Sequence, residues 1–102
     1  MKKEINVLVK EPGCDLFERR KIPNTLEALQ EIVGGYIELV QPCVDLALIV
    51  NEEGKIKGMP YNFTFLNEDL VGPVIAVGVD GEDFDDVPAD INTERWFGIK
   101  EA

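Results

Sequence analysis

Short apolar runs separated by turn residues divide this chain into segments, most of which are typical of β-strands. Residues 5–10 alternate apolar with polar positions, and residues 16–22 are predicted to pair with them as a second, antiparallel strand. Residues 36–40 indicate a third strand. Two further runs, LALIV at 46–50 and PVIAVGV at 73–79, are apolar on both faces, which favours central positions in a sheet.

A helix is predicted between the second and third strands. The apolar residues of segment 26–33 recur at helical spacing, so that one face of the segment is apolar. Either Asn24 or Thr25 is expected to cap its start, and Gly34 is expected to end it. Residues 92–100 predict a terminal helix.

The segment 58–66 is ambiguous because Pro60 interrupts it, and residues 62–68 are compatible with a short helix. The pattern as a whole predicts an α+β fold: a mostly antiparallel sheet of about five strands with two or three helices packed on one face. The length of 102 residues fits a single domain with one core. Within it, residues 85–102 are expected to form an acidic linker and the terminal helix.

Net charge excludes more classes of function than bulk composition does. The chain carries 10 Lys and Arg against 20 Asp and Glu, a net charge of −10, and the acidic excess lies entirely after residue 33. Such a charge repels phosphates, so direct nucleic-acid binding is not expected. The sequence has no histidine, the commonest general base and metal ligand, and neither Cys14 nor Cys43 has an evident activating base. We therefore expect no enzymatic activity and no cofactor.

The N-terminal segment does not resemble a signal peptide, because Glu4 and Asn6 interrupt the part that would have to be apolar. No apolar run approaches the roughly 20 residues that span a bilayer. A cytoplasmic location without a membrane partner is therefore expected, and the two cysteines are expected to be reduced there.

The densest charge lies in DGEDFDDVPAD, residues 80–90, directly after the last strand. Its carboxylates are Asp80, Glu82, Asp83, Asp85, Asp86 and Asp90. A cluster of this kind attracts and orients a basic protein surface, and a merely solvated loop is the simpler interpretation. The spacing does not match an EF-hand loop, so we assign no metal site; a metal-assisted hydrolase using four of these carboxylates stays an open alternative.

The first half of this tract also has architectural features. Gly81 predicts a tight turn after the strand, and Phe84 is expected to anchor the turn to the core. Residues 85–90 are expected to be a solvated linker into the terminal helix.

A second polar cluster flanks the turn that follows segment 46–50. Its members are Asn51, Glu52, Tyr61 and Asn62. Asn51 and Asn62 are placed to fix the loop through side-chain-to-backbone hydrogen bonds. The four residues together are also a candidate site for a small molecule or a nucleotide.

The strongest family signal comes from three longer segments. They are TLEALQEIVGGYIELV (25–40), LALIVNEEGKIKGMPYN (46–62) and GPVIAVGVDGEDF (72–84). In this order they resemble the DUF3846 family, a small domain of unknown function from bacteriophages, conjugative elements and Gram-positive bacterial genomes. The resemblance covers about residues 1–86. It implies an association with mobile elements and assigns no catalytic residue.

Three functions follow as hypotheses. The first is a small, acidic, non-enzymatic interaction protein associated with phages or mobile elements, which binds a basic protein surface. The second is a small-molecule or nucleotide-binding module. The third is a DNA mimic of the anti-restriction type, in which carboxylates replace phosphates; it ranks below the first because Lys and Arg occupy the opening strands. The sequence predicts no oligomeric state.

Overall fold

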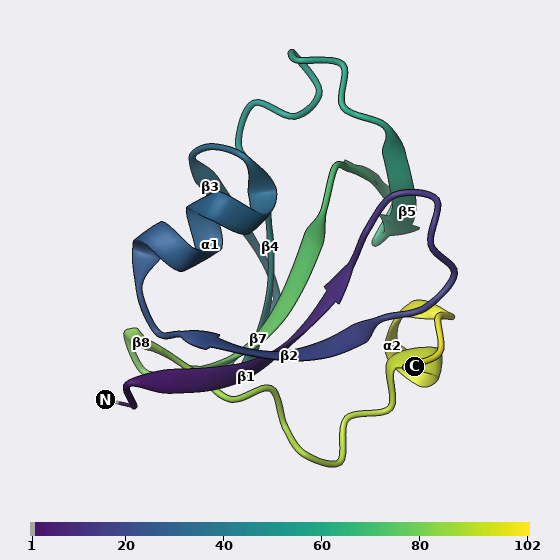
Figure 1. Ribbon diagram of the computed structural model, residues 1–102. Helices are drawn as coiled ribbons and strands as arrows, with labels where there is room; N and C mark the ends of the chain where they lie inside the picture. Colours follow the sequence, from purple (N-terminus) through teal and green to yellow (C-terminus); the bar gives the residue numbers. More distant parts are fainter. Residues whose placement is uncertain (1) are drawn as a thin grey trace.

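The structure is a computed structural model that describes residues 2–102 as eight strands and two helices (Figure 1). The elements are β1 (Glu4–Lys10), β2 (Glu18–Pro23), α1 (Leu26–Val33), β3 (Ile37–Cys43), β4 (Leu46–Asn51), β5 (Tyr61–Phe65), β6 (Glu68–Val71), β7 (Val74–Asp80), β8 (Asp83–Asp85) and α2 (Thr93–Phe97). The main sheet has the order β2-β1-β7-β4-β3, with β8 paired to β7, and β5 and β6 form a separate hairpin. These strand pairs are antiparallel, which confirms an α+β fold built on an antiparallel sheet.

The two runs that are apolar on both faces are central strands, as predicted. They are β4 and β7, which lie inside the sheet and are buried almost throughout their length. One face contributes Ala47, Ile49, Ile75 and Val77 to a core under α1. The opposite face contributes to a second core under the β5–β6 hairpin and α2.

The prediction that the helices pack on one face is therefore wrong. Leu29 and Val33 of α1 join the first core, whereas Phe97 of α2 packs against the second. Phe97 contacts the rings of Phe17 and Phe65, at centroid distances of 5.5 and 5.2 Å. The sheet needs both covers because β1, β4 and β7 present apolar side chains on both of their faces.

The start of α1 is capped by Thr25, one of the two predicted residues. Its hydroxyl accepts a hydrogen bond from the Ala28 N–H at 3.2 Å, and Gly34 ends the helix with a φ of 82°. Asn24 instead donates its side-chain amide to the carbonyls of Lys2 and Phe84, at 3.0 and 3.3 Å. This residue therefore ties the approach to α1 to the segment before β1 and to β8.

The ambiguous segment is a β-hairpin and not a short helix. Phe63 and Phe65 alternate with polar neighbours and point into the second core, together with Leu70 of β6. Leu66 and Asn67 form the turn with φ values of 52° and 62°, which suits a two-residue hairpin connection. The sequence concealed this turn because leucine is an unusual residue for a positive φ.

Neither helix within residues 2–102 has the length and apolar character required to cross a membrane.

Candidate functional site

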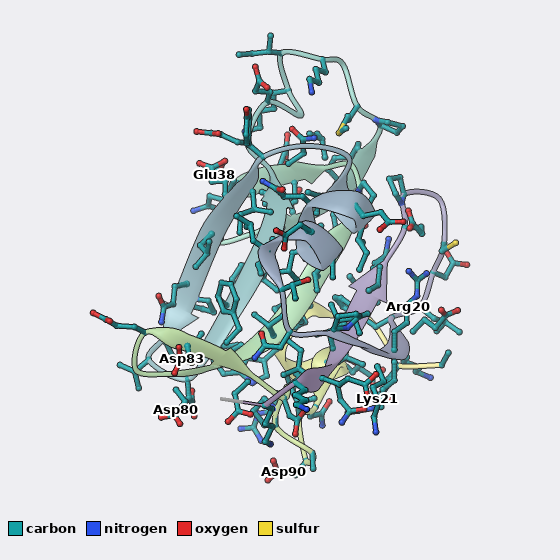
Figure 2. All side chains as sticks on the ribbon, turned by 60° about the vertical axis from the view of Figure 1, so that its left-hand side comes forward. Arg20, Lys21, Glu38, Asp80, Asp83 and Asp90 are labelled. Atoms are coloured by element: carbon teal, nitrogen blue, oxygen red, sulfur yellow. The ribbon has the colours of Figure 1, made fainter. Side chains whose placement is uncertain are left out.

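The acidic tract does not form a single surface, because its parts are held in different ways. Asp80, Glu82 and Asp83 are exposed at the tip of the β7–β8 hairpin, where Gly81 takes a φ of 63°. Phe84 is half-buried against the core under α1, as expected of an anchor. Asp90 is also exposed but lies away from this tip (Figure 2).

Asp85 and Asp86 connect the end of β8 to the N-terminal strand. The Asp86 carboxylate accepts hydrogen bonds from the backbone N–H of Asn6 at 2.7 Å and from its side-chain amide at 3.3 Å. Its other oxygen lies 2.6 Å from the Lys2 ammonium, which is also 3.1 Å from Asp85. The prediction of a solvated linker is therefore wrong for Asp85 and Asp86, whose side chains bind Lys2 and Asn6 near the start of β1.

These contacts lower the pKa of both carboxyl groups. For Asp86 the chief cause is the hydrogen bond from Lys2, followed by the Asn6 N–H; for Asp85 it is the Asp86 N–H, followed by Lys2. A carboxyl group with a lowered folded-state pKa stays ionised while the unfolded chain already binds a proton. The stabilisation is therefore complete above the ordinary aspartate pKa of 3.8 and is lost as the pH falls through the lower, folded-state value.

We expect Asp86→Asn to lower stability at pH 7 and to weaken the loss of stability with acid. The amide keeps an acceptor for the Asn6 N–H but loses the ion pair with Lys2. Urea unfolding at neutral pH and below pH 3.8 measures the difference, which should shrink as the pH falls. Asp90→Asn is the matched control, since Asp90 is exposed and has no ion pair within residues 2–102. Equal effects of the two substitutions would contradict the assignment.

The second predicted cluster is divided between two structural roles. Asn51 is buried, donates to the Val33 carbonyl at 3.1 Å and accepts from the Glu53 N–H at 2.7 Å, so it joins the end of α1 to the turn after β4. Asn51 and Glu52 line a groove of about 240 Å³ beside β3, whereas Tyr61 and Asn62 do not line it. The phenol of Tyr61 is hydrogen-bonded to Thr64 at 2.7 Å. The structure thus does not unite the four residues in one cavity.

Asn62 forms a buried cross-link with a lysine that the sequence pattern did not single out. Lys10 is only 5% exposed, and its ammonium donates to the Asn62 side-chain oxygen at 2.7 Å. The Asn62 amide in turn donates to the carbonyls of Lys10 and Gly72, both at 2.8 Å. The ammonium also lies 5.9 Å from the centroid of the Phe63 ring. Asn62 therefore joins β1 to the β5–β6 hairpin.

Further carboxylates gather on the exposed side of α1. Glu27 and Glu31 lie one helical turn apart and, with Tyr36 and Glu53, line a shallow depression of about 360 Å³. A second depression, of about 210 Å³, joins Leu26 to the tip of the β7–β8 hairpin. We call this surface the acidic α1 face; its carboxylates are Glu27, Glu31, Glu53, Glu82 and Asp83.

Two nonpolar side chains are exposed within the acidic α1 face. Leu26 is 52% exposed and Tyr36 is 67% exposed. The spacing of Glu27 and Glu31, opposite the buried Leu29, was the sequence signal that this helix has a charged outer face. Nothing local in the sequence indicated that the β7–β8 tip lies beside it.

Two basic residues of the edge strand β2 lie on the other side of the molecule. Figure 2 shows Arg20 and Lys21 of β2 opposite Asp80, Asp83 and Glu38. This follows from the strand order, since β2 and β3 are the two edges of the main sheet.

A match to a family model identifies the family of this chain. A family model described as "Domain of unknown function (DUF3846)" matches residues 4–97 of the 102-residue chain. The chain belongs to the DUF3846 family. The expected resemblance is confirmed, and the match continues past residue 86 to include α2. No curated protein and no solved structure matches the chain.

Two observations on this DUF3846 domain concern metal ligands and thiols. Among residues 2–102 no three or more Cys, Asp or Glu side chains are grouped so that they would hold a metal ion. The Cys43 thiol donates to the Asp45 carboxylate at 3.0 Å, which raises the pKa of the thiol and keeps it protonated. What the DUF3846 fold does provide is charged surface, chiefly the acidic α1 face.

Proposed function

We propose that this DUF3846 domain is a non-enzymatic interaction protein that binds a basic protein surface through the acidic α1 face. The observation that supports the proposal is the gathering of carboxylates from three separate segments around exposed Leu26 and Tyr36. Lys57 is the one basic residue lining the larger depression, and it lies 3.8 Å from Glu53. The remaining carboxylates are thus left to attract a partner.

The two kinds of side chain on this face have different effects on binding. Carboxylates at a rim steer a positively charged partner and orient it, mainly by increasing the association rate. Exposed Leu26 and Tyr36 supply nonpolar area that a partner removes from water. An arginine of the partner, entering the depression beside Tyr36, would combine ion pairing with a cation–π contact.

We further propose that the partner is a cytoplasmic protein of a mobile element or of its host, in line with the mobile-element association that the family resemblance implies. A DNA-binding enzyme is one such basic protein, as the DNA-mimic alternative requires. Arg20 and Lys21 on the β2 edge, however, interrupt the negative surface, which favours a partner with a local basic patch.

The test compares affinity capture from the native host by three versions of the domain. The first is the wild type, the second carries Glu27→Gln, Glu31→Gln and Glu82→Gln, and the third carries Glu4→Gln, Asp15→Asn and Asp90→Asn at exposed positions elsewhere. Both variants change the net charge equally. We expect a basic partner whose purified form binds the second version roughly tenfold more weakly and the third almost normally.

The outcome also separates the competing functions. Equal weakening by the two triple variants would show attraction by net charge alone and would contradict a defined face. Unchanged binding by both would place the contact elsewhere. Cross-linking that joins the partner to Lys57, the lysine of the larger depression, would support the proposed location.

A further inference from the structure

Strand β3 has a backbone edge without a partner among residues 2–102. The carbonyl of Tyr36 accepts from the Glu52 N–H at 2.8 Å, and Glu38 pairs with Val50 in the β3–β4 register. In an antiparallel pair, hydrogen-bonded and non-bonded positions alternate, so Ile37 and Leu39 direct their N–H and C=O groups away from β4. The strand order ends at β3, which leaves these groups at the sheet edge.

A groove with an apolar floor and an acidic rim lies beside this edge. It has a volume of about 240 Å³ and separates β3 and β4 from β6. Val50 and Leu70, both buried, contribute to its floor. Its carboxylates are Glu38, Glu52, Glu68 and Asp69.

The charge of the groove is only partly balanced within the chain. Lys55 is the one lysine in the lining, and its ammonium lies 3.3 Å from Glu68. Asp69 accepts a hydrogen bond from the neutral Thr64 hydroxyl at 2.7 Å, which leaves its charge uncompensated. Three of the four carboxylates are therefore without a basic partner in residues 2–102.

We propose that an extended segment of a partner protein, with Lys or Arg at alternate positions, adds as a strand to β3 and places its basic side chains in the groove. The main-chain groups of Ile37 and Leu39 would bind the backbone of the segment. Because side chains alternate across a strand, every second residue of the segment points to the groove side, where Glu38 lies. Charge complementarity with the rim selects basic residues at those positions.

The chain's own basic strand fits this edge less well than a partner does. Arg19 and Arg20 of β2 are already ion-paired, with Glu101 at 2.9 Å and Glu18 at 2.7 Å. The outer backbone of Phe17 is occupied by residues 100–102. Two copies, each with a net charge of −10, also repel each other.

This inference does not rest on the acidic α1 face, and the two sites can be tested separately. The probe is a short synthetic peptide in which arginine alternates with valine, titrated into the ¹⁵N-labelled domain. We expect amide shifts in residues 37–40 and 68–71, and slower hydrogen exchange at Ile37 and Leu39. A peptide with glutamate in place of arginine should not bind.

Backbone pairing is tested by removing donors from the peptide and from β3 separately. A peptide N-methylated at the alternate amides that face β3 keeps its charge but cannot donate to the β3 carbonyls, and we expect it to bind roughly tenfold more weakly. Leu39→Pro removes a backbone donor that points away from β4. It should therefore weaken binding of the arginine peptide while leaving the β3–β4 hydrogen bonds intact. Glu38→Gln with Glu52→Gln should weaken binding, whereas Glu27→Gln with Glu31→Gln should not.

Three results would overturn the proposal. The first is equal binding of the methylated and unmethylated peptides, which would show simple charge attraction. The second is a set of shifts confined to α1 and the β7–β8 tip. The third is self-association that increases with concentration and is abolished by Leu39→Pro, which would identify a second copy of the chain as the occupant.

Discussion

Replacing Asn62 by alanine is expected to destabilise the domain by about 3 kcal/mol, the upper end of the usual cost of leaving a buried polar group without its hydrogen-bond partner. Lys10 is almost fully buried, and the Asn62 oxygen is the one hydrogen-bond acceptor found for its ammonium among residues 2–102. The substitution also removes the donors to the Lys10 and Gly72 carbonyls. Because a domain of this size is stable by only about 5–15 kcal/mol, much of the folded state's margin would be lost.

Urea unfolding followed by circular dichroism measures this effect. The control is the double variant Lys10→Met with Asn62→Leu, which removes the ammonium together with its acceptor. Replacing both partners of a buried polar pair by apolar groups is far less damaging than removing one. We therefore expect the double variant to be clearly more stable than Asn62→Ala, although two carbonyls still lose a donor. If Asn62→Ala cost less than about 1 kcal/mol, the cross-link would not hold the hairpin on the sheet.

The pattern of apolar and polar residues did not predict the cross-link between Lys10 and Asn62. The positions Ile5, Val7 and Val9 predict a strand with one apolar face, and they do pack under α1. The other face of the same strand is also buried, because the hairpin β5–β6 covers Leu8 and Lys10. That cover comes from the segment that was ambiguous in the sequence, so the lysine looked like the polar end of a strand.

The two candidate surfaces could likewise be predicted only in part from the sequence. Charge and spacing indicated an acidic protein and a charged outer face on α1, since both are local properties. The fate of individual carboxylates depends on distant residues: Asp86 is bound by Asn6 and Lys2 from the opposite end of the chain. The neighbours of the β7–β8 tip and of β3 likewise follow from tertiary packing, so no run of residues could identify the acidic α1 face or the groove.

A second substitution with a large expected effect is Gly78→Ala, which should destabilise the domain by about 3 kcal/mol, at the upper end of the usual range for overpacking. Gly78 pairs with Asp85 across the β7–β8 hairpin. A Cβ at this position would overlap the carbonyl oxygen of Asp86 and lie 2.9 Å from its carbonyl carbon. These neighbours are backbone atoms, which cannot rotate away as the end of a flexible side chain can. The end of β8 must therefore move.

The displacement of Asp86 in Gly78→Ala can be detected by adding a second substitution. Displacing the backbone of Asp86 removes its carboxylate from Asn6 and Lys2, so in the Gly78→Ala background the further substitution Asp86→Asn should have almost no effect. Full additivity of the two substitutions would show that β8 stays in place and would contradict the steric argument. Gly13→Ala is the control glycine, because its Cβ would meet no atom within 4 Å. It should cost only about 1–2 kcal/mol, the strain of its positive φ, and should leave the effect of Asp86→Asn unchanged.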